Sequence, residues 1–324
     1  IAQCLVGSEM CIRDRVFIMV FCFSPICTIG CSNEDARMEV DSHMDNPWPV
    51  LKDTMRVLAL GNSYTDDATS YLPVFLADSD IDGEKVCVYM GARAAASLQT
   101  WNDLFDINSV VKLSLKAGKL QMPVVEAPLH EILAQNWDVV VLQQQSDLAV
   151  DYSSYNPYLR NLIKGIKSVC INPNLSFVWQ MPWSHYEGND KKADILWRRI
   201  SIATKKQVFY DGIDIVIPVG TAIQNARHSN LPQTGGVTRD GIHLSYGLGR
   251  YIASVTWFQV LFSHMDTDWM ATDYLYHLSD NEKKAIRENS FYECYDVERE
   301  YQDICKKCAY AAVEDMYSIS NIGD

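Results

Sequence analysis

The residues with the clearest chemical potential are a serine and a histidine that lie far apart in the sequence. Ser63 can act as a nucleophile only if a neighbouring base removes its proton. His243 can be that base, and of the seven histidines it alone has an aspartate, Asp240, three residues before it. This spacing lets a carboxylate accept the imidazole Nδ1–H and leaves Nε2 facing a serine. The pattern predicts Ser63 as nucleophile, His243 as base and Asp240 as the residue that orients the base.

The surroundings of Ser63 are compatible with two roles. Ser63 follows an apolar run at 55–60 and precedes a predicted helix over 66–78, which Asp66 or Asp67 would cap. A helix N-terminus beside a nucleophile offers backbone N–H groups and the positive end of the helix dipole, both of which stabilise an oxyanion. The alternative is that Ser63 only caps the helix.

Two further positions predict an oxyanion hole. Gly91 follows an apolar run, where its backbone N–H can approach a substrate closely. Gln144 lies at the end of another apolar run, and an amide side chain there can donate to an oxyanion. The neighbours Gln143, Gln145 and Ser146 are further candidates. The alternative role for these glutamines is hydrogen bonding between loops.

The elements that must position these residues alternate between strand and helix. Buried strands are predicted at 55–60, 85–90, 138–143, 175–180 and 213–217, and helices at about 126–136, 157–170, 190–209, 219–227 and 245–262. Such alternation indicates an α/β fold with a parallel sheet. Active sites of these folds form at the carboxyl ends of the strands, which places Ser63, Gly91 and Gln144 along one rim.

Four separated motifs resemble those of the SGNH/GDSL hydrolases: serine after the first predicted strand, glycine after the second, an amide after the third and DxxH near the end. Four segments are similar to a bacterial branch of this superfamily that is known mainly as a domain of unknown function: LALGNSYTDDATSYLP, WDVVVLQQQSD, VIPVGTAIQNAR and RDGIHLSYGLGRYIA. The resemblance covers about residues 55–262. It implies a three-layer α/β/α sandwich with a flavodoxin-like sheet and metal-free ester hydrolysis by Ser63, His243 and Asp240. Oxyanion donors would be the N–H groups of Ser63 and Gly91 and a side chain of the third motif.

The sequence departs from the family pattern in two motifs. The first reads GNS in place of GDS, which keeps the serine, and the third lacks the usual Gly-x-Asn, for which Gln144 is the best substitute. Trp179 and Trp183 flank the end of the fourth predicted strand and can bind a sugar ring or simply pack. We expect an exported carbohydrate O-acetylesterase. The alternatives are a lipid or thioester hydrolase with the same triad and a non-catalytic glycan-binding lipoprotein.

Charge and the N-terminal residues predict location and partners. The 324 residues carry a net charge of −13, and an acidic surface disfavours nucleic-acid binding. Residues 1–31 are predicted to be an adaptor-like scar followed by a signal or lipoprotein leader, with Cys31 lipidated, and 32–54 a tether. The expected location is the periplasm or surface of a bacterium, with the lipid as the only membrane contact. The hydrolase domain would cover 55–264, followed by a helical extension at 265–324 that packs on this domain.

No cofactor and no metal are expected. GNSYTD lacks the GxGxxG of dinucleotide-binding folds, and position 65 is Thr, so the GxSxG elbow of α/β-hydrolases is absent as well. Cys305 and Cys308 have a CxxC spacing, but no second pair or histidine lies near them. A solvated helix is the favoured interpretation of that segment, with a disulfide to Cys294 as an option.

Overall fold

The computed structural model describes residues 53–323, apart from 187, 233–235, 268, 270–278, 282–283 and 285–293. Its described part contains a seven-stranded sheet with the strand order β4-β3-β2-β1-β5-β6-β7. The strands are β1 (Met55–Gly61), β2 (Val86–Ala92), β3 (Val110–Gly118), β4 (Glu126–Pro128), β5 (Val139–Leu142), β6 (Ser176–Gln180) and β7 (Ile215–Ile217).

The five strands β2, β1, β5, β6 and β7 are parallel, which confirms the predicted α/β class. The chain runs from β1 to β2 on one side and then continues with β5 on the other side of β1. The C-terminal ends of β1 and β5 therefore form the switch point where ligands bind in sheets of this order. β3 and β4 are antiparallel additions at the β2 edge, and the sequence analysis did not predict β3.

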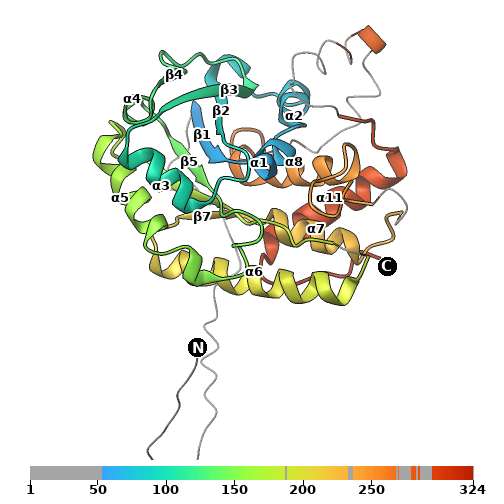
Figure 1. The fold of residues 1–324 in the computed structure, drawn as a ribbon. Coiled ribbons are helices and arrows are strands. Elements are labelled where there is room, and N and C mark those ends of the chain that lie inside the picture. The colour runs from blue at the N-terminus through green and yellow to red at the C-terminus, as the bar shows by residue number, and fades with distance from the viewer. Residues whose placement is uncertain are drawn as a thin grey trace, which may run out of the picture. The chain divides into compact units, whose positions relative to one another are not determined.

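Helices cover both faces of the sheet and create two cores (Figure 1). One core lies under α1 (Ser63–Ala68), α2 (Leu72–Asp78), α7 (Val219–Arg227), α8 (Leu248–Leu261) and α11 (Arg299–Glu314). The other lies under α3 (Leu98–Asp106), α4 (Leu129–Leu133), α5 (Tyr158–Val169) and α6 (Asp190–Tyr210). Because successive residues of β1 point to opposite faces, Val57 and Ala59 join the first core and Leu58 and Leu60 the second. Burial on both faces explains why residues 57–60 of this strand are all apolar.

Several element boundaries differ from the prediction. The predicted helix over 66–78 is two helices, and the first begins at Ser63 with Asn62 as its cap, so the capping role predicted for Asp66 or Asp67 is wrong. Pro73 favours the new start at α2, since proline is accommodated in the first turn of a helix. The helix predicted at 126–136 consists of β4 and the shorter α4.

The C-terminal helix α11 packs on α7 and α8. Cys305 and Cys308 are fully buried there, so the prediction of a solvated helix is wrong. Cys294 is buried as well, and none of these three thiols is in a disulfide. Other parts of the predicted extension, the predicted leader with Cys31 and most of the tether lie outside the described residues. No helix in the described part is long and apolar enough to cross a membrane.

Gly249 near the start of α8 generates a prediction about stability. A Cβ atom at this position would lie 2.1 Å from the Val237 carbonyl oxygen and 3.0 Å from the Leu244 Cβ. We expect Gly249→Ala to lower the free energy of unfolding by about 1–3 kcal/mol, the usual cost of overpacking. Gly83→Ala is the matched control, because the nearest atoms to its Cβ would belong to the Lys119 side chain at 3.7 Å, an ordinary contact distance. Denaturant unfolding measures both, and equal stability of the two variants would contradict the prediction.

Candidate active site

Ser63 is the first residue of α1, directly beyond the end of β1. Asn62 caps this helix, because its side-chain oxygen accepts the Tyr64 N–H at 2.9 Å. The carbonyl of Asn62 accepts the N–H groups of Thr65 and Asp66. The Ser63 N–H has no acceptor among the described residues. Ser63 thus combines an available hydroxyl with a free amide at a helix N-terminus, where an anion is stabilised.

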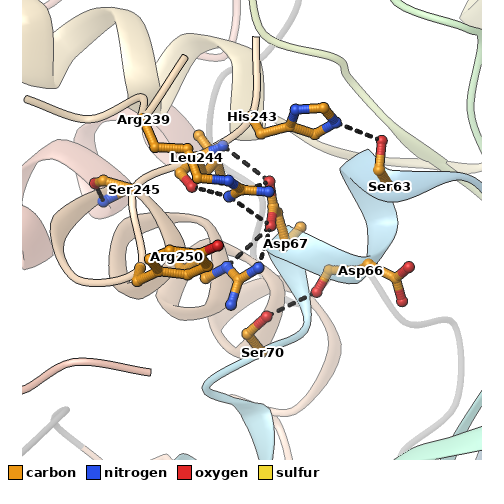
Figure 2. A network of polar contacts seen from close by, with 12 residues as sticks. Ser63, Asp66, Asp67, Ser70, Arg239, His243, Leu244, Ser245 and Arg250 are labelled. Carbon is orange, nitrogen blue, oxygen red and sulfur yellow. Dashed lines mark hydrogen bonds and ion pairs between the residues drawn. The ribbon is translucent and has the colours of Figure 1, made fainter. Parts of the chain in front are cut away.

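His243 and Asp240 lie on a short hairpin, residues 238–244, before α8. An isolated bridge pairs Thr238 with Leu244, and the Arg239 N–H donates to the His243 carbonyl at 2.9 Å. The His243 Nε2 is 3.0 Å from the Ser63 Oγ, and its Nδ1 is 2.8 Å from the Asp240 Oδ2 (Figure 2 shows the Ser63 contact). The structure therefore brings the three predicted residues together in the geometry of a Ser-His-Asp triad.

The Asp240 carboxylate is held by its own loop. Its Oδ1 accepts the backbone N–H groups of Ile242 at 2.9 Å and of His243 at 2.6 Å. Partial burial raises the pKa of Asp240, but these bonds and the His243 side chain outweigh it and lower the pKa to about 2. Asp240 therefore stays ionised near neutral pH and can keep a proton on His243 Nδ1.

Gln144 is not placed as an oxyanion donor, which corrects the sequence interpretation. Its side chain is fully buried, and its amide nitrogen donates to the Ser154 carbonyl and hydroxyl, each at 3.1 Å. Its oxygen accepts the N–H groups of Leu98 and Gln145. These contacts are the loop-to-loop hydrogen bonds that the sequence left open as the alternative.

Gly91 is not placed at the site either. It lies inside β2, paired in register with Leu60 of β1 and Leu113 of β3. Because a strand lies on each side of Gly91, its N–H points toward a neighbouring strand and not toward a substrate. The residues that reach the rim are those of the exposed loop 93–95 that follows β2.

Gln143, one of the four candidates that the sequence left open, contacts the residues around the nucleophile. It is buried, donates to the Asn62 Oδ1 at 2.5 Å, and accepts from the Thr65 hydroxyl at 2.8 Å and from Gln180 at 2.7 Å. Gln180 in turn accepts the Trp257 indole N–H at 2.9 Å. Gln143 thus fixes the cap of the nucleophile helix through the ends of β5 and β6.

Trp179 and Trp183 do not form the sugar-binding surface expected from the sequence, because both side chains are fully buried. Trp183 stacks on Tyr64 with ring centroids 3.8 Å apart and planes inclined by 4°. Its indole N–H donates to the Ile242 carbonyl at 2.7 Å. Trp183 therefore connects the residue after Ser63 to the residue before His243.

The sequence also missed Asp67, which is buried one helical turn after Ser63. Its carboxylate binds Arg239, Leu244 and Arg250 (Figure 2). The only signal in the sequence was the four-residue spacing from Ser63, which places both residues on one helix face. Among the described residues, no group of three or more His, Cys, Asp or Glu side chains is arranged to hold a metal ion.

Comparisons with known proteins give one family and two solved structures. The model of a family described as "Domain of unknown function (DUF4886)" matches residues 56–270. The crystal structure of a DUF4886 family protein from Bacteroides uniformis ATCC 8492 has a TM-score of 0.63 and 24% identity, covering 83% of this chain and 98% of that one. A catalytic mutant of an acetylxylan esterase from Geobacillus stearothermophilus has a TM-score of 0.43 and 12% identity, covering 66% and 97%. No curated protein matches the chain.

The low pKa of Asp240 generates a prediction about pH dependence. Asp240→Asn removes the charge and one acceptor, so the His243 ring loses its fixed tautomer. If the three residues act as a triad, kcat should fall about 10²–10⁴-fold. Because the native carboxylate is ionised far below neutral pH, the native protein should stay more active than the variant as the pH is lowered from about 7 to about 5. A pH–rate profile of both proteins measures this, and a ratio of native to variant activity that falls to one at the acidic end would contradict it.

Proposed function

The chain belongs to the family described as Domain of unknown function (DUF4886), and we propose that it is a serine esterase. The family match agrees with the branch that the motifs predicted. The observation that carries the proposal is a chain of two hydrogen bonds. The Ser63 Oγ lies 3.0 Å from the His243 Nε2, and the His243 Nδ1 lies 2.8 Å from the Asp240 Oδ2. The His243 side chain is 31% exposed, so a substrate can reach it from solvent.

The proposed reaction is acyl transfer in two steps. The His243 Nε2 takes the Ser63 proton as Oγ bonds to the carbonyl carbon of the ester, and the protonated ring then gives that proton to the departing alcohol oxygen. In the second step the same nitrogen takes a proton from water, which attacks the acyl group on Ser63. The carboxylic acid leaves, and the proton returns to Oγ.

Backbone amides are the proposed oxyanion donors in place of Gly91 and Gln144. The Ser63 N–H has no other acceptor in the described part of the chain. The exposed loop that follows β2 supplies the second candidate, because Asn62 donates to the Ala96 carbonyl at 3.0 Å and so holds that loop beside the nucleophile. Ala95 in this loop has φ 52°, a left-handed backbone that non-glycine residues adopt only where the fold requires it.

The proposed substrate class is short acyl esters of polar alcohols, with O-acetylated carbohydrate first. The support is a polar rim around the hairpin. Asp240 is half-exposed, the Asp147 Oδ1 lies 3.6 Å from the His185 Nδ1, and the Tyr186 N–H donates to the Gly241 carbonyl at 2.8 Å. The exported, lipid-anchored location predicted from residues 1–31 belongs to this proposal and would bring the enzyme to extracellular glycans.

The experiment is a hydrolysis assay on p-nitrophenyl acetate, longer p-nitrophenyl esters and acetylated oligosaccharides. We expect Ser63→Ala to lower kcat by about 10³–10⁶-fold, because the nucleophile and base act as a unit. Ser153→Ala, a change at an exposed serine, is the matched control and should retain native activity.

The pattern of activity separates the functions that the motifs left open. Highest activity on acetyl esters, lost in Ser63→Ala, supports the proposal. Highest activity on long acyl chains would redirect it to lipid or thioester substrates. Equal rates for the native protein and Ser63→Ala would exclude the serine esterase, and glycan binding without turnover would then be the better function.

A further inference from the structure

The Asp67 carboxylate is the most heavily bonded polar group around the site. Its side chain is 2% exposed, and a buried carboxylate without partners is strongly destabilising. Its Oδ1 accepts from the Arg250 Nε at 2.9 Å, the Arg250 Nη2 at 2.6 Å and the Arg239 Nη1 at 3.1 Å. Its Oδ2 accepts from the Leu244 N–H at 2.8 Å and from the same Arg239 nitrogen at 3.2 Å. Both carboxylate oxygens are thus occupied (Figure 2).

Two of these partners belong to the hairpin that carries the base. Leu244 directly follows His243, and Arg239 pairs with His243 through its N–H and also donates to the Leu244 carbonyl. Asp67 lies on the same short helix as Ser63. The carboxylate therefore connects the nucleophile helix to the C-terminal side of His243.

A second connection reaches the N-terminal side of His243. The Trp183 indole N–H donates to the Ile242 carbonyl at 2.7 Å, and the ring stacks on Tyr64, the residue after Ser63. The residues on both sides of His243 are thus held by α1 or by a side chain packed on it. Neither connection passes through Asp240.

We propose that Asp67 is a positioning residue that sets the distance between the His243 Nε2 and the Ser63 Oγ, with Trp183 as the second support. The inference rests on the proposed esterase function and adds the residues that place its base. Asp67 acts only through His243 and touches no substrate. Its negative charge is needed because five donor contacts converge on two carboxylate oxygens, and an amide offers a single oxygen and two hydrogens of its own.

The arginines have a further partner, which makes the test practical. Arg239 and Arg250 both lie over the Tyr246 ring, at 4.8 Å and 4.6 Å from its centroid. These cation–π contacts do not involve Asp67 and can still hold the two arginines in the variant. Asp67→Asn should therefore loosen the hairpin while the rest of α8 and the sheet stay folded.

The experiment compares Asp67→Asn with the native protein on p-nitrophenyl acetate. We expect kcat to fall about 10- to 1000-fold with KM within about threefold, since a misplacement of about 1 Å can cost on the order of 100-fold in rate. In a His243→Ala background the same change should alter the residual rate by less than about twofold, because the group it positions is gone. A general loss of structure would lower both backgrounds alike.

Asp66→Asn is the matched control on the same helix. Asp66 pairs with the buried Lys116 of β3 at 2.9 Å, and its carboxylate points away from the hairpin (Figure 2). This variant should keep kcat within about threefold even where its melting temperature falls through loss of the buried ion pair. Circular dichroism and thermal melts establish that each variant is folded.

The outcomes separate this inference from the function on which it rests. Native protein without turnover refutes the esterase and the inference together. Native turnover with a folded Asp67→Asn of unchanged kcat, or with equal losses in both backgrounds, overturns the inference alone. If Asp67→Asn does not fold, Trp183→Phe decides, because it keeps an aromatic ring against Tyr64 and removes the N–H to Ile242. A fall in kcat of about threefold or more is then expected, and unchanged kcat overturns the inference.

Discussion

Burial of the Asp67 carboxylate is the constraint on which the arrangement of the site depends. A carboxylate removed from water must find donors close by, and here they come from residues 172 to 183 positions later in the chain. α1, the hairpin after α7 and the first turns of α8 are therefore assembled around one charge. The guanidinium groups of Arg239 and Arg250 also lie over the Tyr246 ring, which helps to hold them beside the carboxylate.

The uncharged side of the site is organised by Gln143 at the switch point of the sheet. Its amide joins the cap of α1, through Asn62 and Thr65, to the end of β6, through Gln180. Strands supply rigid ends, but the direction in which α1 leaves β1 depends on these amide contacts. The nucleophile is thus fixed from the sheet below it, while the base is fixed from the helix beside it.

The sequence predicted the parts of the site that depend on short spacing or on the end of a strand. Ser63, Asp240 and His243 belong to that class, and the parallel order of the sheet follows from the alternation of strand and helix. Gln143 and Gln144 could not be told apart, because they are neighbours of the same type just beyond β5, and their different partners lie on segments far away in the sequence. Aromatic residues at strand ends were equally ambiguous, and burial of Trp179 and Trp183 is a property of the packed helices.

Strand β3 was missed because Lys112 and Lys116 interrupt its apolar pattern, although Lys116 is buried against Asp66.

Orientation and placement of the base are separate physical tasks in this site. Every hydrogen bond of the Asp240 carboxylate stays within three residues of its own loop, so it sets how the His243 ring is turned and which nitrogen carries the proton. Those bonds would be the same wherever the loop lay. The distance to Ser63 must come from contacts that leave the loop, and the structure provides these through the neighbours of His243, Leu244 on one side and Ile242 on the other. A DxxH motif can therefore be recognised from sequence, but whether its histidine reaches a nucleophile depends on residues outside the motif.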